Sequence, residues 1–288
     1  MKYFSKIKLL IVSFPLLLYS CTFEGNQPEP SVLNGKVRFI YNTDNNGNDT
    51  NSRYYLYYDA TGFLTAVKDD SITVFAFTKL NDTTINVIFH LPNEPIANGI
   101  VRLNGNRVIS IGRYDHFSYP DLGIDTIIYT ELIQTVYSSA NQLDSIYNNV
   151  GYFAFEYITN IKAFDFTFIT NNCTNYKSSW TQTSVYGWPV YQKSAEIIFT
   201  YSDLINDYKV PNHIIPFTFQ YTFGMLPYFL GLNGCFIIEP NKNLIQNYTS
   251  INSSSSDTYD YNYSLTNGKV TSYKVSTRNS VGHIEYYE

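Results

Sequence analysis

The sequence predicts an all-β protein, an antiparallel meander of hairpins that forms one large twisted sheet or an open barrel or sandwich. Tyr and Phe supply 48 of the 288 residues, and aromatic side chains favour strands while providing enough apolar surface to exclude disorder. Apolar and polar residues alternate repeatedly along the chain, and no segment keeps helical spacing over three turns. The 15 Gly and 11 Pro are too few for a collagen-like or low-complexity chain.

Three pairs of alternating segments in the first half of the chain are separated by polar turns. The pairs are 36–41 with 54–58, 72–77 with 84–89, and 100–103 with 108–111. The last pair is joined by Asn104-Gly105, a dipeptide that type I′ hairpin turns favour. Further strands are expected at 153–157, 164–169, 196–201, 218–223, 259–263, 270–275 and 284–287. Short strands at this spacing predict one continuous meander.

The first 20 residues have the pattern of a bacterial lipoprotein signal peptide. Three lysines precede an apolar run at 9–18 that is too short to span a bilayer as a stable helix. The run ends in Leu18-Tyr19-Ser20-Cys21, which resembles the lipobox, although Tyr19 replaces the small residue of the strictest form. The resemblance implies cleavage before Cys21 and its modification with acyl chains such as palmitate. The alternative is an ordinary secretory peptide with a chance cysteine.

This interpretation divides the chain into a signal peptide at 1–20, a lipidated cysteine and flexible tether at 21–34, and a single β-rich domain at 35–288. Cleavage leaves 16 basic and 24 acidic residues, a charge that repels nucleic-acid phosphate. Attachment then comes from the acyl chains, at about 0.8 kcal/mol per buried CH₂. We expect a cell-envelope protein anchored by lipid at the outer membrane, facing the periplasm or the surface.

One hairpin pattern recurs, with an aromatic strand end, a polar turn containing Gly or Asn, and an alternating strand. It covers 58–67, 137–146 and, with one extra turn residue, 263–273. The pattern resembles the Tyr-Asp hairpin repeats of bacterial surface proteins. It is more similar to an uncharacterised family of Bacteroidetes-type lipoproteins, a domain of unknown function. The segments 227–234, 241–245 and 283–288 also look like that family. The resemblance implies location and shape, and no activity.

The two cysteines of the mature domain, Cys173 and Cys235, allow two interpretations. An exported chain meets an oxidising compartment, where a disulfide between them would close a loop of about sixty residues and contribute ~4 kcal/mol. Alternatively, they are two buried thiols without chemistry, since spacing in the sequence does not establish proximity.

Aromatic residues cluster around the only two tryptophans. Trp180, Tyr186 and Trp188 share parity, so one continuous strand would place them on one face, and Tyr191 lies just beyond Pro189. Such a platform binds glycans, because the apolar face of a pyranose stacks on aromatic rings. The more ordinary interpretation is core packing around the turn at 187–189.

Motifs for catalysis and metal binding are weak, and we predict no catalytic residue, no metal and no cofactor. The cluster 113–116 (Arg-Tyr-Asp-His) is more simply an exposed turn than a catalytic Asp–His pair. The loop at 42–47 resembles a calcium loop but has Arg53 where a bidentate Glu is expected. A hydrolase remains an alternative, with acids from distant strands: Glu131, Glu156, Asp165 and Glu196.

Four triplets of Asp, a hydroxyl residue and an aliphatic residue or Thr resemble the acceptor motif of Bacteroidetes-type O-glycosylation. The hydroxyl residues are Ser71, Thr83, Thr126 and Ser145. The same triplets also arise where turns enter strands.

The leading hypothesis is a non-catalytic binding or structural lipoprotein whose partners are the membrane and a polysaccharide or another envelope protein. A glycan-binding lipoprotein is the second hypothesis. A membrane-spanning barrel is suggested by the alternating aromatic C-terminus, but the lipid anchor makes it redundant.

Overall fold

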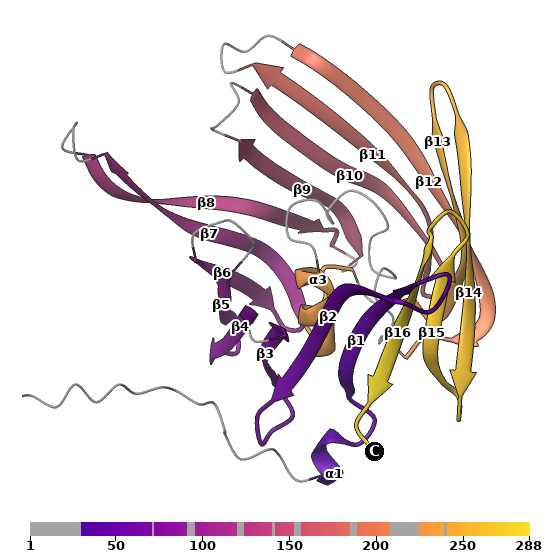
Figure 1. Cartoon of the computed structure of the whole chain (residues 1–288). Coiled ribbons are helices and arrows are strands. Elements are labelled where there is room, and N and C mark those ends of the chain that lie inside the picture. The colour runs from indigo at the N-terminus through magenta and orange to yellow at the C-terminus, as the bar shows by residue number, and fades with distance from the viewer. Residues whose placement is uncertain are drawn as a thin grey trace, which may run out of the picture.

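The chain forms a closed barrel of sixteen antiparallel strands in a computed structural model (Figure 1). The structure describes residues 30–70, 72–90, 96–119, 124–139, 142–152, 157–184, 189–207, 225–238 and 241–288. Each strand pairs with the next along the chain, and β16 returns to pair with β1. The predicted all-β antiparallel meander is therefore confirmed, and it closes into a barrel instead of forming an open sheet, open barrel or sandwich. Within the described residues, no helix is long and apolar enough to cross a membrane.

The barrel strands are β1 (Val37–Asp44), β2 (Asp49–Tyr58), β3 (Leu64–Asp69), β4 (Ile72–Asn81), β5 (Thr84–Phe89), β6 (Ala97–Asn104), β7 (Arg107–Tyr119), β8 (Ile124–Tyr137), β9 (Leu143–Tyr152), β10 (Tyr157–Ile169), β11 (Asn172–Ser184), β12 (Pro189–Ile205), β13 (Asn243–Asn252), β14 (Ser256–Thr266), β15 (Lys269–Val275) and β16 (Ser280–Tyr286). The described residues also form two short helices, α1 (Pro30–Leu33) before the barrel and α3 (Leu226–Leu232) between β12 and β13.

The three hairpins predicted in the first half are confirmed as β1–β2, β4–β5 and β6–β7. The predicted turn type of the third is wrong. Asn104 pairs with Arg107, so the turn is centred on Gly105-Asn106, and only Gly105 has a positive φ (+61°). A glycine with positive φ at the first central position is typical of a type II′ turn.

The recurring hairpin pattern has one turn geometry at two of its three positions. The N–H of Asp59 donates to the carbonyl of Phe63 at 2.9 Å, and that of Ser138 donates to Gln142 at 2.8 Å. The third copy instead turns through Asn267-Gly268, with φ of +52° and +77°. Positive φ at both central residues is the type I′ geometry that fits the twist of a hairpin.

Most of the later predicted strands are confirmed, within β10, β12, β14, β15 and β16. Residues 153–156 and 218–223 lie outside the described residues. Of β8 and β9 the prediction covered only the hairpin at 137–146, and it missed β11 and β13. β11 shows the reason, since its sequence NCTNYKSSWTQTS is too polar for an alternating pattern.

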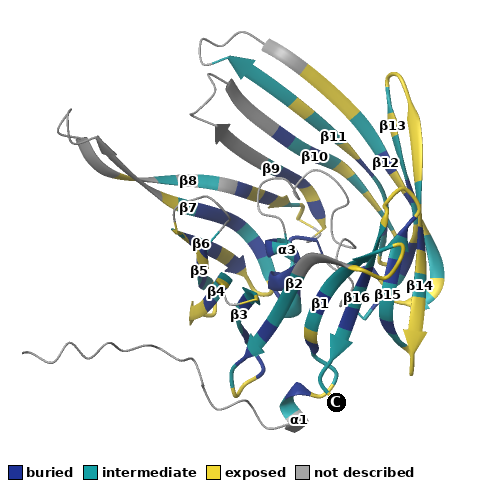
Figure 2. Cartoon of the chain, in the orientation of Figure 1, coloured by how far each residue is buried: buried dark blue, intermediate teal, exposed yellow. Residues whose placement is uncertain are grey.

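The core lies inside the barrel, because strand alternation directs the apolar side chains of the buried residues inward. Figure 2 colours these buried residues dark blue. In β5, Ile85, Val87 and Phe89 are buried, whereas Ile88 between them is exposed. Phe89 also covers a glycine on the neighbouring strand, since a Cβ on Gly99 would lie 2.2 Å from its ring. Large rings over glycines fill the spaces where strands lack side chains.

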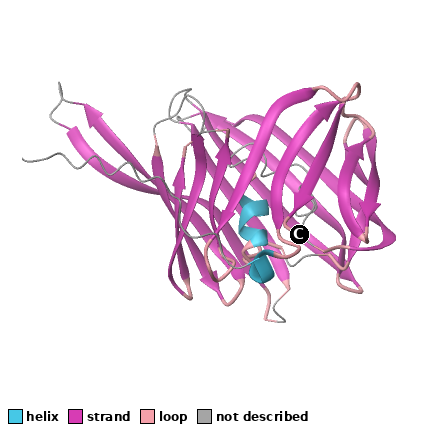
Figure 3. Cartoon of the chain, turned by 60° about the horizontal axis from the view of Figure 1, so that its bottom comes forward, coloured by secondary structure: helices cyan, strands magenta, loops and turns pink. Residues whose placement is uncertain are grey.

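Helix α3 lies within the ring of strands at one end of the barrel (Figure 3). Phe229 of α3 is fully buried, with its ring centroid 5.6 Å from Phe75 and 5.9 Å from Tyr54. After the helix, Asn233 accepts the N–H of Leu64 at 2.6 Å and donates to its carbonyl at 3.1 Å. We call this the closed end. It also holds the turns β2–β3, β4–β5, β6–β7, β8–β9, β10–β11 and β14–β15, the start of β1 and the end of β16. The opposite end is the open end.

Candidate functional site

The inner wall of the barrel changes character along β11. Tyr176, towards the closed end, is 1% exposed and stacks 5.1 Å from Phe166. Trp180 has the same parity four residues further on, and it is 43% exposed. It pairs across the sheet with Ile161, whose side chain is buried in the wall. Trp180 therefore faces inward at a level where solvent reaches the lumen.

The neighbouring positions of this wall are polar. Lys193 of β12 pairs directly with Trp180 and is exposed, and the half-buried Ser178 and Gln182 flank Trp180 on β11. Tyr191 pairs with Gln182. An aromatic ring beside an ammonium group and small polar groups can stack on a sugar and donate hydrogen bonds to its hydroxyl or carboxylate groups. We call Ser178, Trp180, Gln182 and Lys193 the lumen site.

The lumen site contains only part of the predicted aromatic platform. Trp180 lies on β11, and Tyr191 lies on the paired strand β12. Tyr186 and Trp188 lie outside the described residues. Sequence analysis missed Ser178, Gln182 and Lys193, because only the register between β11 and β12 brings them beside Trp180.

A second set of polar groups lies on β2 and β3, eight strands from β11. Asp69 lies close enough to Tyr54 for their charges to interact, and burial raises the pKa of both side chains. Asp70 next to Asp69 raises the pKa of the Asp69 carboxyl further. β3 and β11 are half of a sixteen-stranded barrel apart, so these groups are separate from the lumen site.

The proposed hydrolytic acids do not converge in a buried pocket. Asp165 forms an exposed ion pair with Lys177 at 2.9 Å, and Glu196 pairs across β11–β12 with the same lysine. Glu131 pairs with Gly112 on another part of the barrel, and Glu156 lies outside the described residues. Asp165 and Glu196 thus flank Lys177 on the outer surface, and a solvated group of opposite charges accounts for this arrangement.

The cluster at 113–116 is not a turn, contrary to the prediction. These residues lie within β7 and pair with β8 along their whole length. Arg113 pairs with Gly99 on the other side.

The loop at 42–47 uses its carboxylate to close a hairpin. Asp44 accepts the N–H groups of Asn46 and Asn48, both at 2.8 Å, and the side-chain amide of Asn48 at 3.0 Å. These hydrogen bonds, that from the Asn48 side chain foremost, lower the pKa of Asp44. Nowhere in the described chain do three His, Cys, Asp or Glu gather as a metal site.

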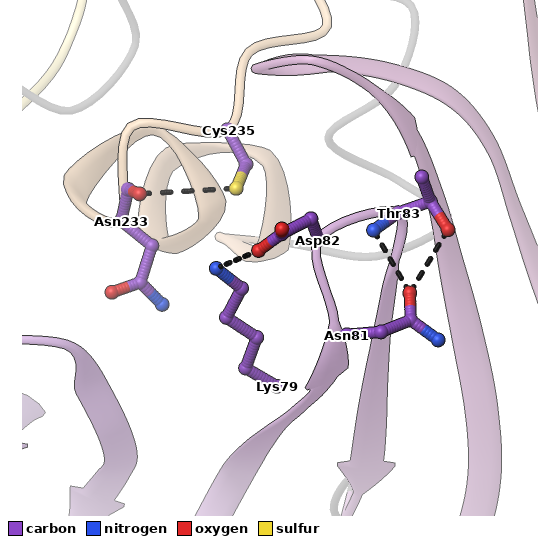
Figure 4. Close-up of polar contacts among 6 residues, drawn as sticks. All are labelled: Lys79, Asn81, Asp82, Thr83, Asn233 and Cys235. Atoms are coloured by element: carbon purple, nitrogen blue, oxygen red, sulfur yellow. Dashed lines mark hydrogen bonds and ion pairs between the residues drawn. The ribbon is translucent and has the colours of Figure 1, made fainter.

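The two cysteines are separate buried thiols, which corresponds to the second of the two interpretations. The Cys173 N–H donates to Asn241 at 2.7 Å, while Cys235 follows α3 with its Sγ 3.8 Å from the Asn233 carbonyl (Figure 4). Burial raises the pKa of Cys173 to about 12 and also raises that of Cys235. High pKa values keep both groups as unreactive thiols at neutral pH.

The predicted glycosylation positions differ in accessibility. Thr83 lies in the exposed β4–β5 turn, where its N–H and hydroxyl both donate to Asn81 at 2.9 Å (Figure 4). Ser145 is 2% exposed, so a glycan on it does not fit the folded barrel. The prediction of Ser145 as an acceptor is therefore wrong for the folded protein. Thr126 lies in β8 opposite Phe117. Ser71 and the lipidation position Cys21 lie outside the described residues.

Comparison with known proteins identifies a fold and no family. No family model and no curated protein matches the chain. A porin-like protein from Bacteroides vulgatus is similar in structure, with a TM-score of 0.55 and 14% identity over 88% of this chain and 98% of that chain. A porin-like protein from Bacteroides uniformis gives 0.44 and 14% over 90% and 100% of the respective chains. The first likeness supports the barrel fold.

Proposed function

We propose that this protein is a non-catalytic lipoprotein of the bacterial cell envelope, anchored through Cys21 to the outer membrane. In this proposal the barrel stands beside the membrane and does not span it. The observation that carries the proposal is the polarity of the two faces of the barrel wall.

The outward face of β10–β16 is largely polar, although Ile198 and Ile251 are exposed on it. Membrane-spanning barrels have a continuous apolar band around the outside, where Lys or Arg at the midplane costs about 2–4 kcal/mol. Here Lys177 and Glu196 are neighbours on adjacent strands, and Arg38 approaches Glu285 at 4.0 Å across β1–β16. The other polar residues of this face include Lys162, Thr200, Asp260, Asn262 and Lys274.

Apolar side chains outside the barrel lie on several strands, as at Ile88 of β5, and in an aromatic group around β1. Phe39 stacks on Tyr55 and Tyr41 at 4.4 and 5.0 Å, and Tyr41 stacks on His283. The inner face, in contrast, carries the hydrophobic core. An apolar interior with a largely polar exterior is the arrangement of a barrel in water.

Replacing the anchor cysteine tests the proposal directly. We expect Cys21→Ala to move the protein from the membrane fraction to the soluble fraction, because acyl chains supply the membrane affinity. Thr22→Ala, which leaves the lipobox cysteine in place, is the matched control and should remain with the membrane. A Cys21→Ala protein that resists extraction from membranes would show that the barrel itself is inserted.

A second candidate function is binding of a glycan at the lumen site. It is favoured by the inward-facing, partly exposed Trp180 opposite Lys193. Titration of the intact lipoprotein with a panel of neutral and acidic polysaccharides should change its tryptophan fluorescence. Trp180→Ala should abolish the change and Trp180→Phe should retain binding. Unchanged fluorescence and no calorimetric heat across the panel would exclude this function.

We also propose O-glycosylation at exposed acceptor triplets, among them Thr83 in the β4–β5 turn. The intact mass of the native protein should exceed that of the lipidated polypeptide, and Thr83→Ala should lose one glycan. A native mass equal to the lipidated polypeptide alone would contradict the modification.

A further inference from the structure

We propose that the closed end of the barrel is a membrane-contacting surface that seats on lipid acyl chains and headgroups. The inference rests on the proposed lipid anchor and adds the surface through which the folded domain meets the bilayer. It draws on three features of the closed end: where the tether joins, which aliphatic side chains are exposed, and how cations and tyrosines are paired.

The tether joins the barrel at the closed end. Leu33 of α1 is buried, the Lys36 N–H donates to its carbonyl at 2.8 Å, and the Gly35 N–H donates to Tyr287 at 3.0 Å. The entry of the chain is therefore fixed beside the end of β16. The eight residues 22–29 reach at most about 30 Å when fully extended. A lipid at Cys21 thus holds the closed end, and not the open end, near the bilayer.

Exposed aliphatic side chains surround the closed end. Leu80 is 57% exposed at the end of β4, and Ile169 is 60% exposed at the end of β10. Val136, Ile205 and Leu265 are also exposed at the closed-end termini of β8, β12 and β14. They come from strands distributed around the barrel, so a flat apolar surface placed against this end would contact them together.

Cations at the same end lie over tyrosine rings. Lys36 lies 5.3 Å from the ring centre of Tyr58, Arg107 lies 5.3 Å from that of Tyr137, and Lys269 lies 5.3 Å from that of Tyr286. The three cations are half-buried, with aliphatic stems along the protein. Tyrosine with Lys or Arg is the combination that anchors proteins at membrane interfaces, where rings sit at headgroup level and cations meet lipid phosphate.

Apolarity alone does not distinguish the two ends. Ile72 and Ile127 are exposed at the open-end termini of β4 and β8. Cation–tyrosine pairs also occur elsewhere on the barrel, as in Lys68 over Tyr57 and Lys162 over Tyr147, so the attachment of the tether selects the closed end. These two isoleucines lie on the same strands as Leu80 and Val136, so they provide matched controls.

The test measures contact with acyl chains at each end of one strand. The mature chain carries an N-terminal histidine tag in place of the lipid and is held on vesicles of phosphatidylethanolamine, phosphatidylglycerol and a nickel-chelating lipid. Leu80→Trp and Ile72→Trp are compared, with Val136→Trp and Ile127→Trp as a second pair. Quenching by brominated lipid tails requires near contact, so tethering alone does not produce it.

We expect brominated lipids to quench the tryptophan at Leu80 and Val136 about twofold more than the tryptophan at Ile72 and Ile127. Equal quenching at the two ends, or stronger quenching at the open end, overturns the inference. A closed-end tryptophan that is shielded without vesicles, increasingly with protein concentration, also overturns it and identifies a second copy as the occupant. Because the tag replaces the acyl chains, failure here is distinct from failure of Cys21→Ala to release the protein.

Discussion

The closed and open ends of the barrel are built from the same strands and differ in what occupies the interior. At the closed end the inner side chains pack on α3, and Phe229 and Leu64 are fully buried. At the open end an inner residue of β11, Trp180, is 43% exposed. Strand alternation determines which residues face inward at both ends, but the long connection after β12 determines which of them become core.

This difference follows from the width of the barrel. Eight strands enclose an interior that side chains fill, whereas sixteen leave a channel. The segment containing α3 fills one end, and its polar groups are satisfied by the turns around it. Phe236 illustrates this, since its N–H donates to Asn106 and its carbonyl accepts from Val108, both at 2.8 Å. We therefore expect stability to depend on the closed end and ligand contact on the open end.

The largest effect is expected from removing the central ring of the closed end. Phe229→Ala leaves a cavity between Phe75 and Tyr54, and it should lower the free energy of unfolding by about 3–5 kcal/mol. Urea denaturation followed by circular dichroism measures this. Phe229→Leu, which retains most of the volume, should cost clearly less. Equal, small costs for both variants would mean that α3 does not pack in the interior.

A smaller loss is expected from breaking the link between Asn233, which follows α3, and β3. Asn233→Ala removes both hydrogen bonds to the backbone of Leu64 and should cost about 2 kcal/mol, because a backbone donor and acceptor lose their partner. Asn81→Ala removes two similar bonds to Thr83 in an exposed turn (Figure 4). Solvent replaces those, so this control should cost under about 0.5 kcal/mol. Comparable losses in the two variants would show that the Asn233 hydrogen bonds contribute no more to the free energy of unfolding than those of an exposed turn.

Alkaline pH should weaken the aromatic core between the ends. Burial raises the pKa of Tyr261 to about 12, against an opposing effect of Arg278. An unfolded tyrosine ionises near pH 10, so the raised folded pKa stabilises the protein fully below pH 10. That contribution is lost as pH rises to about 12, at about 1.4 kcal/mol per pH unit for each such tyrosine.

Urea midpoints at pH 8, 10 and 11 test this dependence. Tyr261→Phe should flatten the decline above pH 10, whereas Tyr114→Phe, with an exposed ring, should leave it unchanged. Cys173 adds to the decline of the parent protein from about pH 9, since burial raises its pKa to about 12. A parent protein whose stability is level up to pH 11 would contradict burial of these groups.

The features that the sequence predicts are mostly local. Local alternation predicts the hairpins because that pattern depends only on residues close together in the sequence. The strand that contains Ile85 and Val87, which pairs with β4, is an example. The polar β11 escapes it, since inward Ser178 and Gln182 face the lumen and need no apolar side chain. Closure depends on β1 meeting β16, a contact between residues 236 to 249 positions apart that local patterns do not contain.

The lumen site was predictable only in part for the same reason. Trp180 and Tyr191 stand out by residue type, but Lys193 becomes relevant only through its pairing with Trp180. Helix α3, with the sequence LPYFLGL, is too short and too uniformly apolar for helical periodicity to predict. Its role in filling the closed end is a tertiary property.

The smallest effect on stability is expected at Trp180, the residue on which the difference between the two ends depends most. If the lumen is open there, Trp180→Ala removes a ring that solvent already reaches, and the free energy of unfolding should change by about 1 kcal/mol or less. Tyr176→Ala, on the same face but in the core beside Phe166, should cost about 3 kcal/mol or more. A large loss for Trp180→Ala would place its ring in the core, and the lumen site would then be packing and not a binding surface.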